Sequence, residues 1–136
     1  MSLESLNRRL AAIPKAVREA VQPALTNSGD ELAAAMKALA ETSRDSGDLI
    51  ESIAVTAGGQ TTPPYSQPGG SRVVPENAVA VTAGNSKVRY PHLVEYGTTK
   101  IAAQPFFWPA YRLLKKRLQR RIKRSIGKAV REGWHQ

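Results

Sequence analysis

Few side chains in this chain are of the types that carry out catalysis or bind metal ions. The 136 residues include two histidines and no cysteine. His92 lies close to Tyr90 and Glu95, and His135 is the last residue but one. A Ser/His/Asp arrangement would need a buried acid that orients His92, and the sequence singles out none. We therefore expect no catalytic residue and no metal site, and we interpret Glu95 as a structural carboxylate that could pair with a basic residue of a neighbouring element.

Sequence motifs that bind phosphate or dinucleotides are also missing. There is no Gly-x-x-x-x-Gly-Lys-Ser/Thr loop, no Gly-x-Gly-x-x-Gly turn and no His-x-x-x-His pair. No apolar run approaches the roughly 18–20 residues that a membrane span requires. With 41% apolar and 23% charged residues, the composition is that of one small globular domain over residues 1–136. These absences argue against an enzyme, a cofactor and a small-molecule substrate.

The positive charge of the chain is concentrated in its last quarter. The whole chain has a formal charge of +9, but residues 100–136 alone hold eleven basic residues and one acid, a net of +10. Residues 1–99 hold nine basic and ten acidic residues, a net of −1. Such an asymmetry suggests an anionic partner for one element, although a helix with a simple solvated face would look the same.

The basic residues belong to a predicted amphipathic helix over residues 105–131. Prolines at 105 and 109 fit its first turn, and the apolar residues from Tyr111 to Ala129 recur every three or four positions. Such a helix would be roughly 40 Å long, which implies that it projects or has a partner surface. The candidates for contact with DNA or an acidic partner lie away from the apolar stripe: Arg112, Lys116, Arg117, Arg120, Lys123, Arg124, Lys128 and Arg131.

The remaining elements predict an α+β fold, with a small antiparallel sheet packed against helices. Residues 1–45 show helical periodicity. Pro14 should separate a short first helix from a longer second one, and Pro23 should kink the second helix or lie near a joint. A sheet of two to four strands is expected within residues 49–89, with the clearest strands over 52–57 and 78–83. Between them, residues 58–71 hold four Gly and three Pro and predict a flexible loop. Residues 90–97 predict a short helix that ends at a glycine with positive φ.

Two neighbouring segments form a distinctive motif pair. Residues 90–99 read Tyr-Pro-His-Leu-Val-Glu-Tyr-Gly-Thr-Thr, and residues 103–110 read Ala-Gln-Pro-Phe-Phe-Trp-Pro-Ala. They resemble the motifs Tyr…Val-Glu-Phe-Gly-Thr and Ala-x-Pro-Phe-hydrophobic-x-Pro-Ala of the neck, or tail-completion, proteins of long-tailed phages and prophages. Residues 46–53 are similar to that family's segment at the start of its sheet. The resemblance extends from about residue 3 to residue 131, with tyrosine at position 96 where phenylalanine is commoner.

The resemblance implies a structural virion protein with a tail-terminator-like fold. Such proteins assemble as a ring, often of six subunits, that joins the tail tube or tail terminator to the head connector or stopper proteins. Genomic DNA passes through the lumen, and assembly takes place in the cytoplasm of the bacterial host. The resemblance implies no cofactor, no small-molecule substrate and no membrane.

Two alternatives remain beside this interpretation. The basic helix could serve a nucleic-acid-binding protein of low sequence preference, or it could lie on an anionic membrane surface. The membrane reading is weakened because the stripe has no Trp or Phe beyond Trp108. For the aromatic run, plain core packing competes with a role as an anchor between subunits. The candidate interface residues are Tyr65, Glu95, Tyr96, Gly97, Phe106, Phe107 and Trp108.

Overall fold

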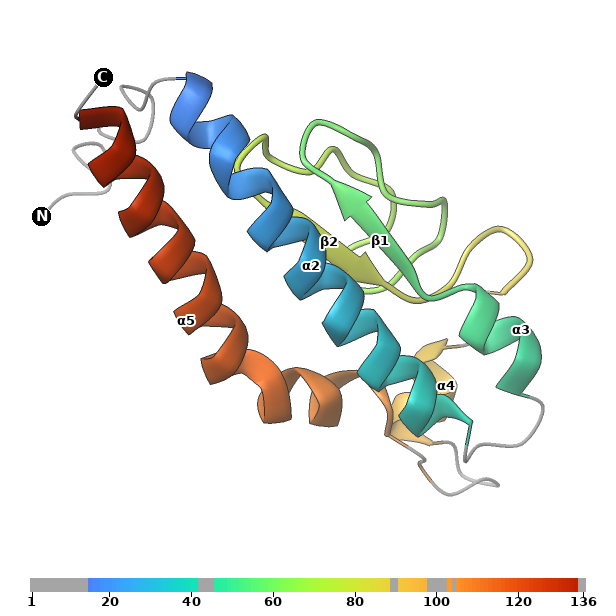
Figure 1. The fold of residues 1–136 in the computed structure, drawn as a ribbon. Helices are drawn as coiled ribbons and strands as arrows, with labels where there is room; N and C mark the ends of the chain where they lie inside the picture. Colours follow the sequence, from blue (N-terminus) through green and yellow to red (C-terminus); the bar gives the residue numbers. More distant parts are fainter. Residues whose placement is uncertain (1–14, 42–45, 89–90, 98–102, 104, 135–136) are drawn as a thin grey trace, which may run out of the picture.

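Two long helices lie side by side, and one of them also packs against a small sheet (Figure 1). The computed structural model describes residues 15–41, 46–88, 91–97, 103 and 105–134. The elements are α2 (Lys15–Ala40), α3 (Ser46–Glu51), β1 (Ala54–Ala57), β2 (Val79–Thr82), α4 (Pro91–Tyr96) and α5 (Phe107–Trp134). This is the expected α+β fold. The expected break at Pro14 lies outside the described residues.

Helix α2 runs through Pro23 without a break, so of the two expected outcomes, a kink or a nearby joint, the structure excludes the joint. An internal proline removes one hydrogen bond and costs about 3 kcal/mol. Buried side chains on both sides of it, among them Val21 and Leu25, hold the helix against its neighbours. The proline ring itself is exposed, so it does not disturb that packing.

The predicted sheet region begins too early, because residues 46–51 form the helix α3. Asp48 lies in the first turn of α3, where a carboxylate is favoured by the helix dipole. Leu49 is 1% exposed, and the hydroxyl of Ser52 donates to its carbonyl oxygen at 2.6 Å. The buried leucine and the local hydrogen bond explain why this segment coils before the chain becomes extended at Ala54.

The sheet has two antiparallel strands, paired from Ala54 with Thr82 to Ala57 with Val79. Beyond these two strands, Thr61 and Val73 form an isolated antiparallel bridge within the segment that connects them. The predicted loop carries its own hydrogen bonds: the buried Thr62 hydroxyl donates to the carbonyl oxygen of Gly70 at 2.9 Å and accepts from the amide of Arg72 at 2.8 Å. These bonds use backbone groups that a longer strand would have paired.

Helix α2 is the centre of the packing, since it contacts α5, both strands and α3. At Gly29, an added Cβ would lie 2.8 Å from a methyl of Val55 and 3.0 Å from one of Val79. Glycine thus allows α2 to approach the sheet closely, and a larger residue would push the two layers apart.

The buried apolar side chains form two clusters of different size. The larger, here called the corner core, lies where α2, α3 and the sheet meet the start of α5. Its fully buried members are Leu32, Ala33, Met36, Ala40, Leu49, Ile53, Ala83, Val88, Phe106, Phe107, Ala110 and Leu118. The smaller, here called the distal core, joins the start of α2 to the end of α5 through Val17, Val21, Leu25 and Ala129.

Helix α5 follows its predicted stripe only in part. Leu118 and Ala129 are buried and Ile122 is half-buried, but Ile126, another member of the stripe, is 40% exposed. The helix begins two residues later and ends three residues later than the predicted 105–131. None of the helices in the described part of the chain combines the length and the hydropathy needed to cross a lipid bilayer.

Candidate assembly interface

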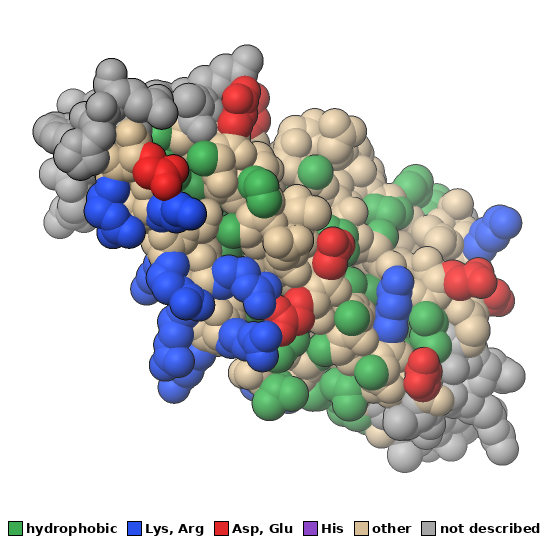
Figure 2. Space-filling model, in the orientation of Figure 1, with side chains coloured by type: hydrophobic (Ala, Val, Ile, Leu, Met, Phe, Trp, Pro, Cys, Tyr) green, Lys and Arg blue, Asp and Glu red, His purple; other side chains and the backbone are tan. Residues whose placement is uncertain are grey.

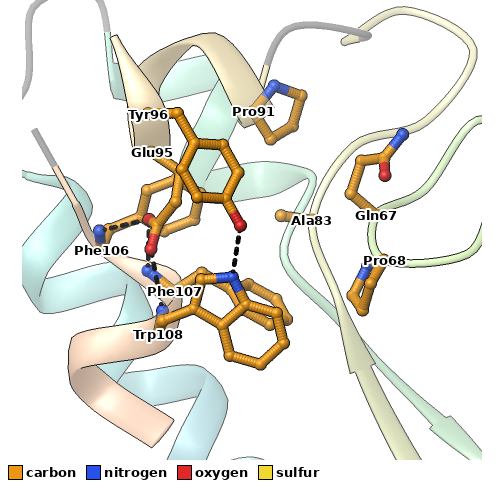
Figure 3. Close-up of a pocket in the computed structure, with 9 residues that line it drawn as sticks. All are labelled: Gln67, Pro68, Ala83, Pro91, Glu95, Tyr96, Phe106, Phe107 and Trp108. Carbon is orange, nitrogen blue, oxygen red and sulfur yellow. Dashed lines mark hydrogen bonds between the residues drawn. The ribbon is translucent and has the colours of Figure 1, made fainter. Parts of the chain in front are cut away.

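The carboxylate of Glu95 joins α4 to the first turn of α5. Its Oε2 accepts hydrogen bonds from the amides of Phe106 at 2.8 Å and Phe107 at 3.0 Å, and its Oε1 accepts one from the amide of Trp108 at 3.0 Å (Figure 3). Amides at a helix start have no partner within the helix, and a negative charge there also meets the helix dipole favourably. Glu95 is 6% exposed, so these bonds are shielded from water.

The local sequence around Glu95 explains how α4 can present this carboxylate. Gly97 has φ of 76°, and its amide donates to the carbonyl oxygen of Leu93 at 2.8 Å. The predicted positive φ at the end of the short helix is therefore confirmed. A glycine in this conformation ends α4 at once and lets the chain turn away.

The partners of Glu95 differ from those expected. The sequence suggested pairing with a basic side chain, but the structure gives the carboxylate three backbone amides, separated from it by 11 to 13 positions. Both carboxylate oxygens are engaged in holding a helix start. This arrangement suits a structural role rather than proton transfer.

The three consecutive aromatic residues divide between the core and the surface. Phe106 is 1% exposed and Phe107 is 8% exposed, and their rings meet edge to face at 6.3 Å between centroids. Trp108 is only half-buried, stacks edge to face on Phe107 at 5.0 Å, and its Nε1 donates to the hydroxyl of Tyr96 at 2.8 Å (Figure 3). Core packing thus accounts for the two phenylalanines, and the indole is left as the candidate anchor.

Exposed apolar side chains accumulate at the same corner. Tyr96 is 69% exposed and Leu93 is 44% exposed on α4, and the half-buried Trp108 lies against Tyr96. Tyr96 and Trp108 also border a small pocket together with Gln67 and Pro68 of the loop (Figure 3). Single exposed apolar residues are ordinary, but several on adjoining elements are typical of contact surfaces.

The remaining candidate residues give weaker indications of a function. Tyr65 is 53% exposed and has φ of 62°, an uncommon conformation for a residue with a Cβ. The side chain of His92 lies outside the described residues. Within the described part of the chain, no group of three or more His, Cys, Asp or Glu side chains could hold a metal ion.

The eight basic residues singled out in the sequence of α5 divide into two that form ion pairs with described residues and six that do not. Arg117 Nε lies 3.1 Å from Glu31 Oε1, and Lys128 Nζ lies 4.0 Å from Glu132 Oε1. The other six predicted residues are exposed and form no ion pair with any described residue: Arg112, Lys116, Arg120, Lys123, Arg124 and Arg131. Figure 2 shows blue side chains gathered over α5, at the left of the molecule.

One basic residue with a clear role was missed in the sequence. Arg121 Nη1 lies 2.7 Å from Glu31 Oε2, so Glu31 of α2 binds two arginines of α5 that are one helical turn apart. The four-residue spacing from Arg117 was available as a signal, but the partner lies 90 positions upstream in the sequence. Arg121 is half-buried and anchors α5 to the body rather than facing a partner.

Comparison with known proteins gives one match. The family model described as "Bacteriophage HK97-gp10, putative tail-component" matches residues 4–97. No curated protein and no solved structure matches the chain. The matched span includes Glu95 and Gly97 but ends before α5.

Proposed function

The chain belongs to the HK97-gp10-like family of phage tail components, whose model covers more than half of it, and from this premise we propose that it forms a ring at the phage head–tail junction. A phage tail component is a structural protein of the virion. In the proposed ring, each subunit contributes to a junction between the tail tube or tail terminator and the head connector or stopper proteins. The ring would surround the passage of the genomic DNA, after assembly in the host cytoplasm.

The observation that carries this proposal is the one-sided charge of α5. One flank of the helix is bound to α2 through Glu31, and another flank enters the two cores. The remaining side presents six exposed cations over residues 112–131, a distance of about 28 Å along the helix axis. Such a row fits a surface that lines a passage for a polyanion.

The corner supports the second half of the proposal, contact with other virion proteins. The start of α5 is fixed by Glu95, so the exposed Tyr96 and Leu93 sit on an element with a defined position. Aromatic side chains in such positions are frequent anchors of protein interfaces. We expect no catalytic activity, because the buried carboxylate at this corner is occupied by amides.

Mass photometry and negative-stain imaging of the purified chain, alone and with tail-tube and connector proteins, test this function. The proposal predicts rings, or particles bound at the end of tail tubes. A chain that stays monomeric and binds neither partner at any concentration would contradict it.

The same six cations favour a second candidate function, non-specific binding of nucleic acid. If they contact phosphates, the logarithm of the binding constant should fall with the logarithm of salt concentration by about 0.9 per phosphate neutralised. Replacing Arg120 and Arg124 by glutamine should lower the slope by about 2. The control variant changes Lys37 and Lys87 to glutamine, which removes the same charge away from α5.

A measurement of assembly distinguishes the two candidate functions. Tight binding of DNA by a monomer that forms no ring favours the second function. Weak binding, lost by about 300 mM salt, by a chain that forms rings favours the first.

A further inference from the structure

The outer edge of β2 has backbone groups that point away from β1 and have no partner. Ala83 exchanges two hydrogen bonds with Gln67, at 2.8 Å and 3.0 Å, on the side away from β1. Since the two sides alternate along an antiparallel strand, the amide and carbonyl of Val81 and Val79 face the same way as those of Ala83. None of these four groups forms a hydrogen bond with another described residue.

A groove opens along this edge, between β2 and α5. Its floor is α2, where Ser28 and Leu32 line it, and Lys115 and Gln119 of α5 and Arg72 of the loop stand at its sides. Figure 1 shows the reason for the groove: α2 has the sheet behind it, whereas α5 continues beside α2 with no strand of the described chain over it.

A buried polar atom in the floor of this groove lacks a partner. Ser28 is 2% exposed, and its Oγ forms no hydrogen bond within the described part of the chain. Buried hydroxyls are nearly always hydrogen-bonded, because an unpaired one costs roughly 1–3 kcal/mol. Ser28 is among the residues that line the groove, so the unpaired hydroxyl marks its floor as a place where a polar partner is missing.

The opposite side of the molecule has an open strand edge and acidic residues, which complement the groove. By the same alternation, the amide and carbonyl of Val55 face away from β2, at the outer edge of β1. The chain from 46 to 71, which includes α3 and β1, holds Asp48 and Glu51 and no Lys or Arg. In Figure 1 this side lies away from α5, so the acidic edge and the basic groove are on opposite sides of one subunit.

We propose that the groove between β2 and α5 receives the β1 edge of a second copy of this chain, with Asp48 and Glu51 of that copy facing Arg72 and Lys115. The occupant is a second copy because this chain supplies both an unpaired strand edge and the opposite charge. The contact uses two different surfaces, so it is heterologous and can close into a ring or continue as a filament. It deepens the proposed function and rests on it for the expectation of a closed ring.

Charge reversal with mixing tests the contact. One variant carries Arg72→Glu and Lys115→Glu, which leaves both surfaces acidic; the other carries Asp48→Lys and Glu51→Lys, which leaves both basic. Each alone should lose at least about tenfold in self-association, because like charges meet at every contact. An equimolar mixture should assemble again with alternating subunits, because each altered surface then meets its opposite.

The control is Lys37→Glu with Lys87→Glu, an equal charge change outside the groove, and circular dichroism confirms that every variant is folded. Restored assembly in the mixture supports the contact. If the wild-type chain forms rings and the variants do so equally well, the contact is wrong while the proposed function stands. If the folded wild-type chain associates neither with itself nor with tail and connector proteins, both are wrong.

Discussion

The corner between α4 and α5 and the far half of α5 are held in different ways. At the corner, a buried carboxylate fixes three amides and the large corner core surrounds the helix start. The far half rests on the small distal core and on the ion pair of Arg121 with Glu31. The same helix thus changes along its length from a part that stabilises the fold to a part that presents charge. Truncation of buried side chains should therefore cost more stability at the corner than farther along α5.

Truncation of a buried leucine gives the largest contrast between the two cores. Leu49→Ala in the corner core should lower the free energy of unfolding by about 4 kcal/mol, and Leu25→Ala in the distal core by about 2 kcal/mol. Both variants lose the same side-chain atoms, so the difference between their losses of stability reflects how the leucine is packed in each core. Urea denaturation of both variants checks it, and equal losses would remove the distinction between the cores.

Loss of the Glu95 carboxylate should give the next-largest decrease in stability. Glu95→Ala leaves three amides at the start of α5 without their acceptor, and we expect a loss of about 3 kcal/mol. Glu41→Ala, at an exposed position, serves as the control and should change stability by less than about 0.5 kcal/mol. A similar small effect for both would show that Glu95 does not hold the corner.

Two glycine substitutions, one in each region, should change the stability of the fold in opposite directions. Gly97→Ala places a Cβ at φ of 76° and should cost about 1 kcal/mol. Gly127→Ala, inside α5, would place its Cβ 3.6 Å from Nη1 of Arg131 one turn on, and should stabilise by up to about 1 kcal/mol through better helix propensity. Thermal unfolding shows whether each variant is more or less stable than the wild-type chain. A stabilised Gly97→Ala variant would contradict the described end of α4.

The smallest effect concerns the ion pairs between α2 and α5. Glu31→Gln removes the shared partner of Arg117 and Arg121 and should cost about 1 kcal/mol or less, since these side chains are partly solvated. The loss should shrink further in 1 M salt. A large, salt-independent loss would mean that the pairs act as part of the core.

The sequence predicts the α+β class and the basic helix well, because both rest on periodicity within one segment. It fails at residues 46–51, where a buried leucine and a side-chain hydrogen bond favour a helix. The contacts of Glu95 and Arg121 join separate elements. A motif can mark Glu95 as notable, but only the fold identifies its partners as the amides of α5.

Amide hydrogen exchange in the dilute monomer and in the assembled particle tests most directly the claim that one region holds the fold and another receives a partner. The account predicts that the amides of Phe106, Phe107 and Trp108 are protected in both states. Those of Val79 and Val81 should exchange fast in the monomer and become protected on assembly. Fast exchange at the start of α5, or no change at β2 when rings form, would contradict it.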